Sequence, residues 1–270
     1  MRYVYFTKTL QKLNLGELIA FCKEVGLDGV DLAVRPGYPV HPDNALKALP
    51  DVARQLKEAG LTIGLVSAPT NLTDPGSRTA KALFDACARA EVPALKLGYF
   101  AYSAPFDDCL KAARRRLDGF AKLAQASNVK ACYHTHSGSM LGNNAAGLRL
   151  LLEESDPHHV GAFFDTGHTA VNGGPARMEV DLVRRWLALV AIKDMAWAKH
   201  KAGWSYHVVP VGQGIVKWPD VGRALKDCKF AGTISLHGEY EAEGLGERKR
   251  LAKDELAALK RWLGGGRTTP

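Results

Sequence analysis

The sequence predicts an α/β protein, a closed (β/α)₈ barrel, on three observations. Eight short apolar runs rich in β-branched residues recur along the chain, and segments with helical periodicity separate them. This alternation is typical of βαβ units that form a parallel sheet. Eight units in 270 residues fit a closed barrel, which spans about 250 residues, better than a doubly wound sheet. No G-x-G-x-x-G motif follows the first run, which also disfavours a dinucleotide-binding sheet.

The apolar runs give the positions of the eight predicted strands. They are Tyr3–Phe6, Gly29–Ala33, Leu61–Ser67, Ala94–Gly98, Val129–His134, Val160–Asp165, Leu189–Lys193 and Gly232–His237. No composition shift or low-complexity block divides the chain. We therefore expect one barrel domain over residues 1–263, followed by a flexible tail over residues 264–270.

The predicted helices begin and end at recognisable signals. Asn14 and Glu17 have the spacing of a capping box at the start of a helix expected over 14–25. A second helix, expected over 43–59, stops before Gly60, since glycine favours the position just past a helix end. The last two helices are expected over Pro219–Cys228 and Glu247–Leu263.

The composition predicts a soluble cytoplasmic protein. Five widely spaced cysteines without a C-x-x-C pair indicate neither a disulfide framework nor a zinc ribbon, and fit a reducing compartment. The N-terminus lacks the apolar segment of a signal peptide, and no run reaches the length of a membrane span. The net charge of +8 favours acidic partners, so that phosphorylated metabolites and nucleic acid both stay open.

Polar residues end most of the predicted strands, where the chemistry of a barrel is located. In chain order these residues are Asp31 with Arg35 after it, Lys96, His134 and His136, Asp165 and His168, Lys193 and Asp194, and His237 and Glu239. Because side chains alternate along a strand, His134 and His136 share a face, as do His237 and Glu239. Crowding carboxylates and imidazoles is costly unless a cation or a charged ligand compensates them. The pattern therefore predicts a site at this end of the barrel.

Several of these residues have structural alternatives. Lys193 is either a functional cation or a buried counter-ion of Asp165 or Asp194. Arg35 and Lys96 either bind a substrate phosphate or face solvent. Trp197 and Trp204 are expected in a loop after the seventh strand, where they wall the site, pack in the core or contact another subunit.

Six segments in the same order resemble the xylose isomerase-like (β/α)₈ barrels, the superfamily of sugar-phosphate isomerases and epimerases. The segments are Gly29–Gly37, Tyr133–Gly138, Asp165–His168, Ile192–Asp194, Pro210–Gly214 and Ile234–Tyr240. The resemblance runs nearly end to end and is closest to a poorly characterised branch. It implies a small-molecule sugar or sugar-phosphate substrate, with no membrane partner.

In better-known members such as the D-tagatose 3-epimerase-like enzymes, a Glu, an Asp, a His and a second Glu hold a divalent metal. The resemblance places Asp165 at the aspartate and His168 at a neighbouring histidine that contacts substrate. His134 falls at the first glutamate, Ala191 at the ligand histidine, and His237 at or near the last glutamate. Ala191 cannot coordinate a metal, so two alternatives stay open. The metal site is either rebuilt from His136, Asp165, His237 and Glu239, or absent.

With a metal, the resemblance implies proton abstraction next to a carbonyl, with Mn²⁺, Mg²⁺, Co²⁺ or Zn²⁺ as the ion. We expect Glu239 to be the base and His136 or His237 to return the proton. Lys193 would neutralise developing charge, and Arg35 or Lys96 would hold a phosphate or carboxylate. His134, His168 and Trp197 complete the expected substrate-binding set.

Two other functions remain alternatives. The apurinic-site endonucleases belong to the same superfamily, and the positive net charge suits DNA, but the chain offers fewer His and Glu ligands than their three-metal pattern. The other alternative is a barrel that binds a sugar without converting it, because Ala191 stands where the family has a ligand histidine. The sequence leaves the choice among isomerisation, epimerisation and dehydration open, and it leaves a homo-oligomer open.

Overall fold

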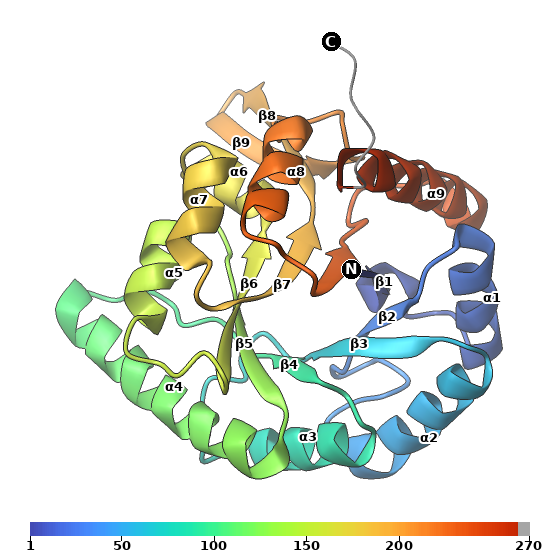
Figure 1. The fold of residues 1–270 in the computed structure, drawn as a ribbon, viewed down its shortest axis with the longest axis horizontal. Helices are drawn as coiled ribbons and strands as arrows, with labels where there is room; N and C mark the ends of the chain where they lie inside the picture. The colour runs from blue at the N-terminus through green and yellow to red at the C-terminus, as the bar shows by residue number, and fades with distance from the viewer. Residues whose placement is uncertain (264–270) are drawn as a thin grey trace.

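A computed structural model describes residues 1–263, whose strands close into a barrel surrounded by helices (Figure 1). The strand order around the barrel is β1-β10-β7-β6-β5-β4-β3-β2, and neighbouring strands are parallel. The predicted (β/α)₈ barrel is confirmed. The tail predicted over 264–270 lies outside the described residues. Within the described residues, no helix is long and apolar enough to cross a membrane.

All eight predicted strand positions are confirmed, with ends that shift by at most two residues. The barrel strands are β1 (Arg2–Phe6), β2 (Gly29–Ala33), β3 (Thr62–Ser67), β4 (Ala94–Lys96), β5 (Lys130–His134), β6 (Val160–Asp165), β7 (Leu187–Ile192) and β10 (Thr233–Leu236). Their carboxyl ends meet at one end of the barrel because the strands are parallel. This end carries the polar residues that the sequence singles out.

The helices cover the outer face of the barrel (Figure 1). They are the short 3₁₀ helix η1 (Thr7–Leu10) and the α-helices α1 (Leu15–Val25), α2 (Ala45–Glu58), α3 (Arg78–Arg89), α4 (Phe106–Ser127), α5 (Ala145–Leu152), α6 (Thr166–Asn172), α7 (Ala176–Val183), α8 (Trp218–Asp227) and α9 (Gly244–Leu263). The capping box of Asn14 and Glu17 forms at the start of α1. Gly60 follows α2 with a φ of +77°, the left-handed conformation that glycine adopts without strain.

The segment predicted as a loop after the seventh strand is an antiparallel hairpin, so that prediction is wrong. It consists of β8 (Asp194–His200) and β9 (Gly203–Val209), which pair only with each other among the described strands. Its turn lacks the Asn-Gly or Asp-Gly pair that identifies a tight hairpin in a sequence. Half of the strand residues of the hairpin are exposed and only Asp194 and Met195 are buried, so the segment has no clear apolar alternation.

Two apolar layers hold the barrel together. The larger lies between the strands and the surrounding helices. The smaller fills the barrel interior with Val4, Leu65, Ala94, Cys132, Phe163, Leu189 and Ala191. Ala191 is therefore an interior packing residue, directly below the polar end of the barrel.

Glu255 on α9 is a buried carboxyl group outside that polar end. Glu255 is only 4% exposed, and its carboxyl group accepts a hydrogen bond of 3.1 Å from the backbone N–H of Val211. Burial outweighs this hydrogen bond and raises the pKa of Glu255 to about 7, from an ordinary value of 4.5. The folded protein therefore holds a proton that the unfolded chain releases at lower pH.

We predict that this proton makes stability fall as the pH rises. The favourable contribution of protonated Glu255 is complete below about pH 4.5 and is lost as the pH approaches 7. The loss amounts to roughly 3 kcal/mol. Urea denaturation of Glu255→Gln should show that this share of the pH dependence has disappeared. Glu241→Gln, an exposed change, should keep it, and identical profiles for Glu255→Gln and the wild type would contradict the assignment.

Candidate active site

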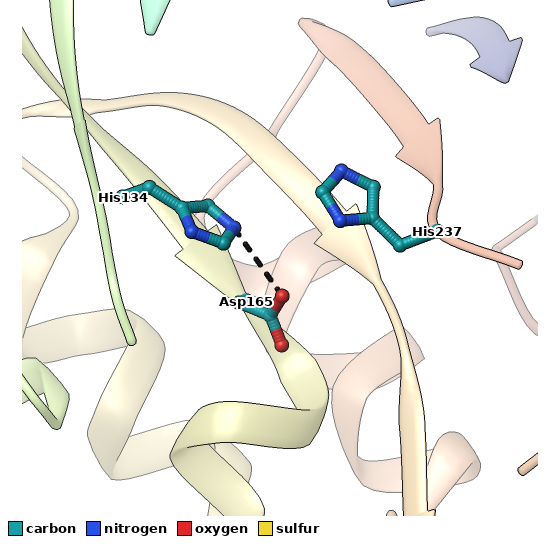
Figure 2. A group of neighbouring side chains, drawn as sticks. All are labelled: His134, Asp165 and His237. Carbon is teal, nitrogen blue, oxygen red and sulfur yellow. Dashed lines mark ion pairs between the residues drawn. The ribbon is translucent and has the colours of Figure 1, made fainter. Parts of the chain in front are cut away.

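Three buried side chains point toward one another at the carboxyl ends of the strands (Figure 2). His134 ends β5, Asp165 ends β6, and His237 directly follows β10. Each offers a ligand atom, and these atoms lie within 4.8 Å of one another. His134 Nε2 is 3.2 Å from Asp165 Oδ2. All three residues are at most 4% exposed.

Four buried atoms of this group have charged neighbours but form no hydrogen bond among the described residues. They are His134 Nε2 and Asp165 Oδ2, which lie 3.2 Å apart, and the two ring nitrogens of His237, which lie 3.4 Å from Asp31 and 3.5 Å from Glu239. The remaining polar atoms of His134 and Asp165 are held, since Tyr99 Oη lies 3.0 Å from His134 Nδ1 and the backbone N–H of His168 donates to Asp165 Oδ1 at 2.9 Å. Unpartnered buried atoms are costly. Two imidazoles and a carboxylate are ligands for a divalent transition metal, so the residues present fit such an ion.

Lys193, just past the end of β7, connects this group to a second carboxylate. Its Nζ lies 2.8 Å from Glu239 Oε1 and 3.7 Å from Asp165 Oδ2. Burial alone would lower the pKa of Lys193, but Asp165 and Glu239 outweigh it and raise the pKa. Burial would likewise raise the pKa of Glu239, but Lys193 and His237 hold it well below its usual range. Lys193 and Glu239 therefore form a charged pair, which Lys8 also joins through Glu239.

His168 is a neutral imidazole with a fixed tautomer. Burial lowers its pKa to about 3. Its Nδ1 accepts a hydrogen bond of 3.2 Å from the backbone N–H of Ser137, so the ring proton is on Nε2. That Nε2 lies 3.3 Å from Lys193 Nζ. With this tautomer both groups are donors, so neither accepts a hydrogen bond from the other.

The other predicted histidine and tryptophan lie beside this arrangement. His136 is outside the three-residue metal group: its Nδ1 lies 2.9 Å from the carbonyl oxygen of Ser137, and its ring packs against His168 at 4.2 Å. Trp197 is on β8, 42% exposed, with its ring edge-on to Tyr206 at 5.4 Å. Tyr206 reaches the site directly, since its hydroxyl is 2.7 Å from Ser137 Oγ.

Arg35 follows β2 and Lys96 ends β4, and each lies against an aromatic ring. Lys96 Nζ is 3.8 Å from the centre of the Tyr99 ring. The Arg35 guanidinium is 5.3 Å from the centre of the Phe6 ring, which itself stacks on His237 at 4.5 Å. Neither residue simply faces solvent, because Lys96 is buried and Arg35 is half-buried.

The arrangement can be compared with known proteins. The sequence profile of the xylose isomerase-like TIM barrel family matches residues 19–262. The chain belongs to this family. No curated protein sequence matches it. The resemblance that the sequence motifs indicate is thereby confirmed.

Solved structures share the family's fold with this chain at low sequence identity. A D-tagatose 3-epimerase-like protein is 17% identical, with a TM-score of 0.77 and 97% of each chain covered. The 3-keto-D-glucoside 4-epimerase YcjR from E. coli is 17% identical, with a TM-score of 0.74, covering 96% of this chain and 99% of that one. The IolI protein, solved with a bound zinc atom, is 16% identical, with a TM-score of 0.78, covering 98% of this chain and all of the other.

The three side chains that cluster as possible metal ligands differ from the set expected from the sequence. That set comprised His136, Asp165, His237 and Glu239, whereas the atoms that cluster belong to His134, Asp165 and His237. Glu239 is close, with Oε1 3.5 Å from His237 Nδ1, but its oxygens also contact Lys193 and Lys8.

Sequence reasoning gave no role to four residues that the structure places in the site. Asp31 Oδ2 accepts a hydrogen bond of 2.9 Å from Ser235 Oγ and lies 3.4 Å from His237 Nε2. The others are Lys8, Tyr99 and Ser137. Lys8 follows β1 by two residues, so the same search at the end of the first strand would have found it. Tyr99 and Ser137 lie in loops, where only the folded structure shows which side chains turn inward.

Asp194 has a structural role, although it follows Lys193 at a strand end. Its oxygens accept hydrogen bonds of 2.9 to 3.1 Å from the backbone N–H groups of Met195, Gly212, Gly214 and Val216 and from Trp218 Nε1. This carboxylate therefore joins the base of the hairpin to the segment before α8. It is not a counter-ion of Lys193, which pairs with Asp165 and Glu239.

We predict that Asp194→Asn destabilises the fold by about 3 kcal/mol or more, because the new amide group turns a donor toward N–H groups that need an acceptor. Urea denaturation monitored by circular dichroism would measure the loss. Asp227→Asn removes an exposed carboxylate and should change the unfolding free energy little. Equal stabilities of the two variants would show that Asp194 does not anchor this segment.

Proposed function

We propose that this protein is a sugar isomerase or epimerase that removes a proton from the carbon next to a carbonyl group. The observation that carries the proposal is the cluster of three buried metal-ligand side chains beside the Lys193–Glu239 pair. The sugar epimerases among the structural neighbours support it, since their fold is the same. A carbonyl-adjacent proton needs a base, a stabiliser for the resulting negative charge and a proton donor.

His134, Asp165 and His237 would hold a divalent metal. When bound, such an ion acts as a Lewis acid that withdraws charge from the substrate carbonyl. Two imidazoles and one carboxylate suit Zn²⁺, Co²⁺ or Mn²⁺ better than Mg²⁺, which prefers oxygen ligands. The zinc in the IolI structure belongs to that protein and supports the same choice of ion class here.

Glu239 would be the base. Its low pKa keeps it ionised, but the ion pair with Lys193 also weakens it as a base. A substrate oxygen that draws the Lys193 ammonium toward itself would leave Glu239 with less compensation. The pKa of Glu239 would then rise as the substrate binds, and the carboxylate would become a stronger base at the moment it is needed.

Lys193 and His168 would stabilise the developing negative charge. Their donor atoms lie 3.3 Å apart and neither can accept from the other, so a substrate oxygen between them receives two hydrogen bonds. Ser137 preserves this geometry by holding the His168 tautomer. His136 packs against His168, and its Nδ1 donates to the carbonyl oxygen of Ser137. It would return a proton to the substrate carbon only after taking one up from solvent at Nε2, while the proton held by Glu239 is released to solvent.

We predict that the wild-type protein binds one equivalent of Zn²⁺, Co²⁺ or Mn²⁺ and that His237→Ala weakens this binding by a factor of about 100 or more. Elemental analysis after dialysis and isothermal titration would measure both. His207→Ala removes an exposed histidine of the hairpin and should bind metal like the wild type. Stoichiometric binding that is unchanged in His237→Ala would show that the metal binds at another site. No binding by the wild type would show that the protein does not use a metal at this site.

We predict that Glu239→Gln lowers the turnover rate by a factor of roughly 10² to 10⁴, because an amide cannot accept the substrate proton. A screen of ketoses and their phosphates in deuterated water, followed by NMR, would detect exchange at the carbon next to the carbonyl. Glu241→Gln, exposed and two residues away, is the matched control. Unchanged exchange in Glu239→Gln would assign the base to another residue. Absence of exchange with every sugar would favour a barrel that binds without converting its ligand.

A further inference from the structure

The polar end of the barrel contains more positive side chains than its own carboxylates can pair. Among the described residues, the cations gathered there are Lys8, Arg35, Lys96 and Lys193, and the carboxylates are Asp31, Asp165 and Glu239. The carboxylates are already engaged. Asp165 contacts His134 and Lys193, Glu239 contacts Lys193 and Lys8, and Asp31 contacts Ser235 and His237.

Lys96 and Arg35 are the two cations left without a carboxylate. Lys96 is only 2% exposed, and its Nζ is buried without a hydrogen-bond partner among the described residues. The Nε of Arg35 is also buried and unpartnered. Burial and the nearby Arg35 charge lower the pKa of Lys96 well below its usual value, and they outweigh the opposite effects of Asp31 and Glu239. The carboxylates near Lys96 therefore do not supply enough negative charge to offset burial and Arg35, and a bound anion would raise the pKa of Lys96 again.

Both cations lie one aromatic ring away from the proposed metal group. Tyr99 separates Lys96 from His134, with its ring under the ammonium and its hydroxyl 3.0 Å from His134 Nδ1. Phe6 separates Arg35 from His237 in the same way. Lys96 ends β4 and Arg35 follows β2, whereas the metal group comes from β5, β6 and the end of β10. A sugar reacting at the metal group would direct its far end toward the β2–β4 side.

We infer that Arg35 and Lys96 form a subsite for an anionic group, the phosphate or carboxylate of an acidic sugar. This inference rests on the proposed function for the sugar part of the ligand. An oxyanion between the two side chains would supply the acceptors that Lys96 Nζ and Arg35 Nε lack. A divalent metal at His134, Asp165 and His237 would add two positive charges nearby and strengthen the preference for an anion. The hydroxyl groups of a neutral sugar can accept hydrogen bonds here but bring no negative charge.

Isothermal titration of the full-length protein with matched probes would test the subsite. The probes are inorganic phosphate, D-fructose 6-phosphate, D-gluconate and the neutral sugar D-fructose. We expect at least one anionic probe to bind with a Kd below about 1 mM and at least tenfold more tightly than D-fructose. Tighter binding of D-fructose 6-phosphate would identify a sugar phosphate as the ligand class, and tighter binding of D-gluconate a sugar acid.

The variants Lys96→Met and Arg35→Gln remove one positive charge each. Each should weaken the anionic probe by a factor of about 10 or more, since each removes a charge-assisted hydrogen bond, while leaving D-fructose unchanged. Lys111→Met and Arg115→Gln make the same changes on exposed positions of α4 and should bind every probe like the wild type. Equal binding of neutral and anionic probes, or no saturable binding of any anionic probe, would overturn the inference.

Stability separates a ligand-binding lysine from a structural one. A buried ammonium without a counter-ion destabilises the folded protein, so Lys96→Met should unfold at an equal or higher urea concentration than the wild type. A marked loss of stability in Lys96→Met would show that the fold itself needs the charge, and would contradict the inference. Binding is measured without turnover, so anion selectivity without proton exchange would disprove the isomerase and keep the subsite. Proton exchange in a neutral sugar that is unaffected in Lys96→Met would keep the isomerase and disprove the subsite.

Discussion

The arrangement of the polar end depends on the ammonium of Lys193. It lies between the buried Asp165 and the partly buried Glu239, 2.8 Å from Glu239 and 3.7 Å from Asp165. Lys193 offsets the repulsion between Asp165 and Glu239. The neighbouring histidines act with it, so that His168, Lys193 and His134 hold the pKa of Asp165 well below its ordinary value. Lys193 and His237 do the same for Glu239, and both carboxylates stay ionised.

The parallel barrel brings these residues together from distant parts of the sequence. Asp31 and His237 are separated by most of the chain, yet β1 pairs with both β2 and β10, so the two strand ends come close. The barrel interior below them is filled by apolar side chains that include Phe163 and Leu189, and Ala191 belongs to that layer. A histidine side chain at position 191 would have to share this packed space. The chain therefore places its donor imidazoles on β5 and after β10 instead of on β7.

The sequence was sufficient for the fold and for placing several polar residues at one end of the barrel. Eight apolar runs separated by helical segments follow directly from backbone geometry, and the ends of parallel strands must meet, so Lys96, Asp165 and Lys193 could be placed at one end in advance. The sequence could not predict which atoms of these side chains face one another. Alternation puts His134 and His136 on one face, but β5 ends at His134, and beyond it the backbone turns His136 toward Ser137. The hairpin was missed for a similar reason, because its pairing buries little surface.

Charge balance connects the altered ligand set with the unpaired cations. The family pattern that the motifs resemble surrounds a divalent ion with three carboxylates and one imidazole, which together more than neutralise it. In this chain one carboxylate and two imidazoles remain, so a bound divalent ion would leave the immediate site positive. Lys96 and Arg35 add to that excess, since Asp31, Asp165 and Glu239 already contact other groups. A neutral sugar would leave the excess uncompensated in a buried site. An acidic sugar would supply the missing negative charge, so the loss of carboxylate ligands and the anionic subsite are two parts of one electrostatic requirement.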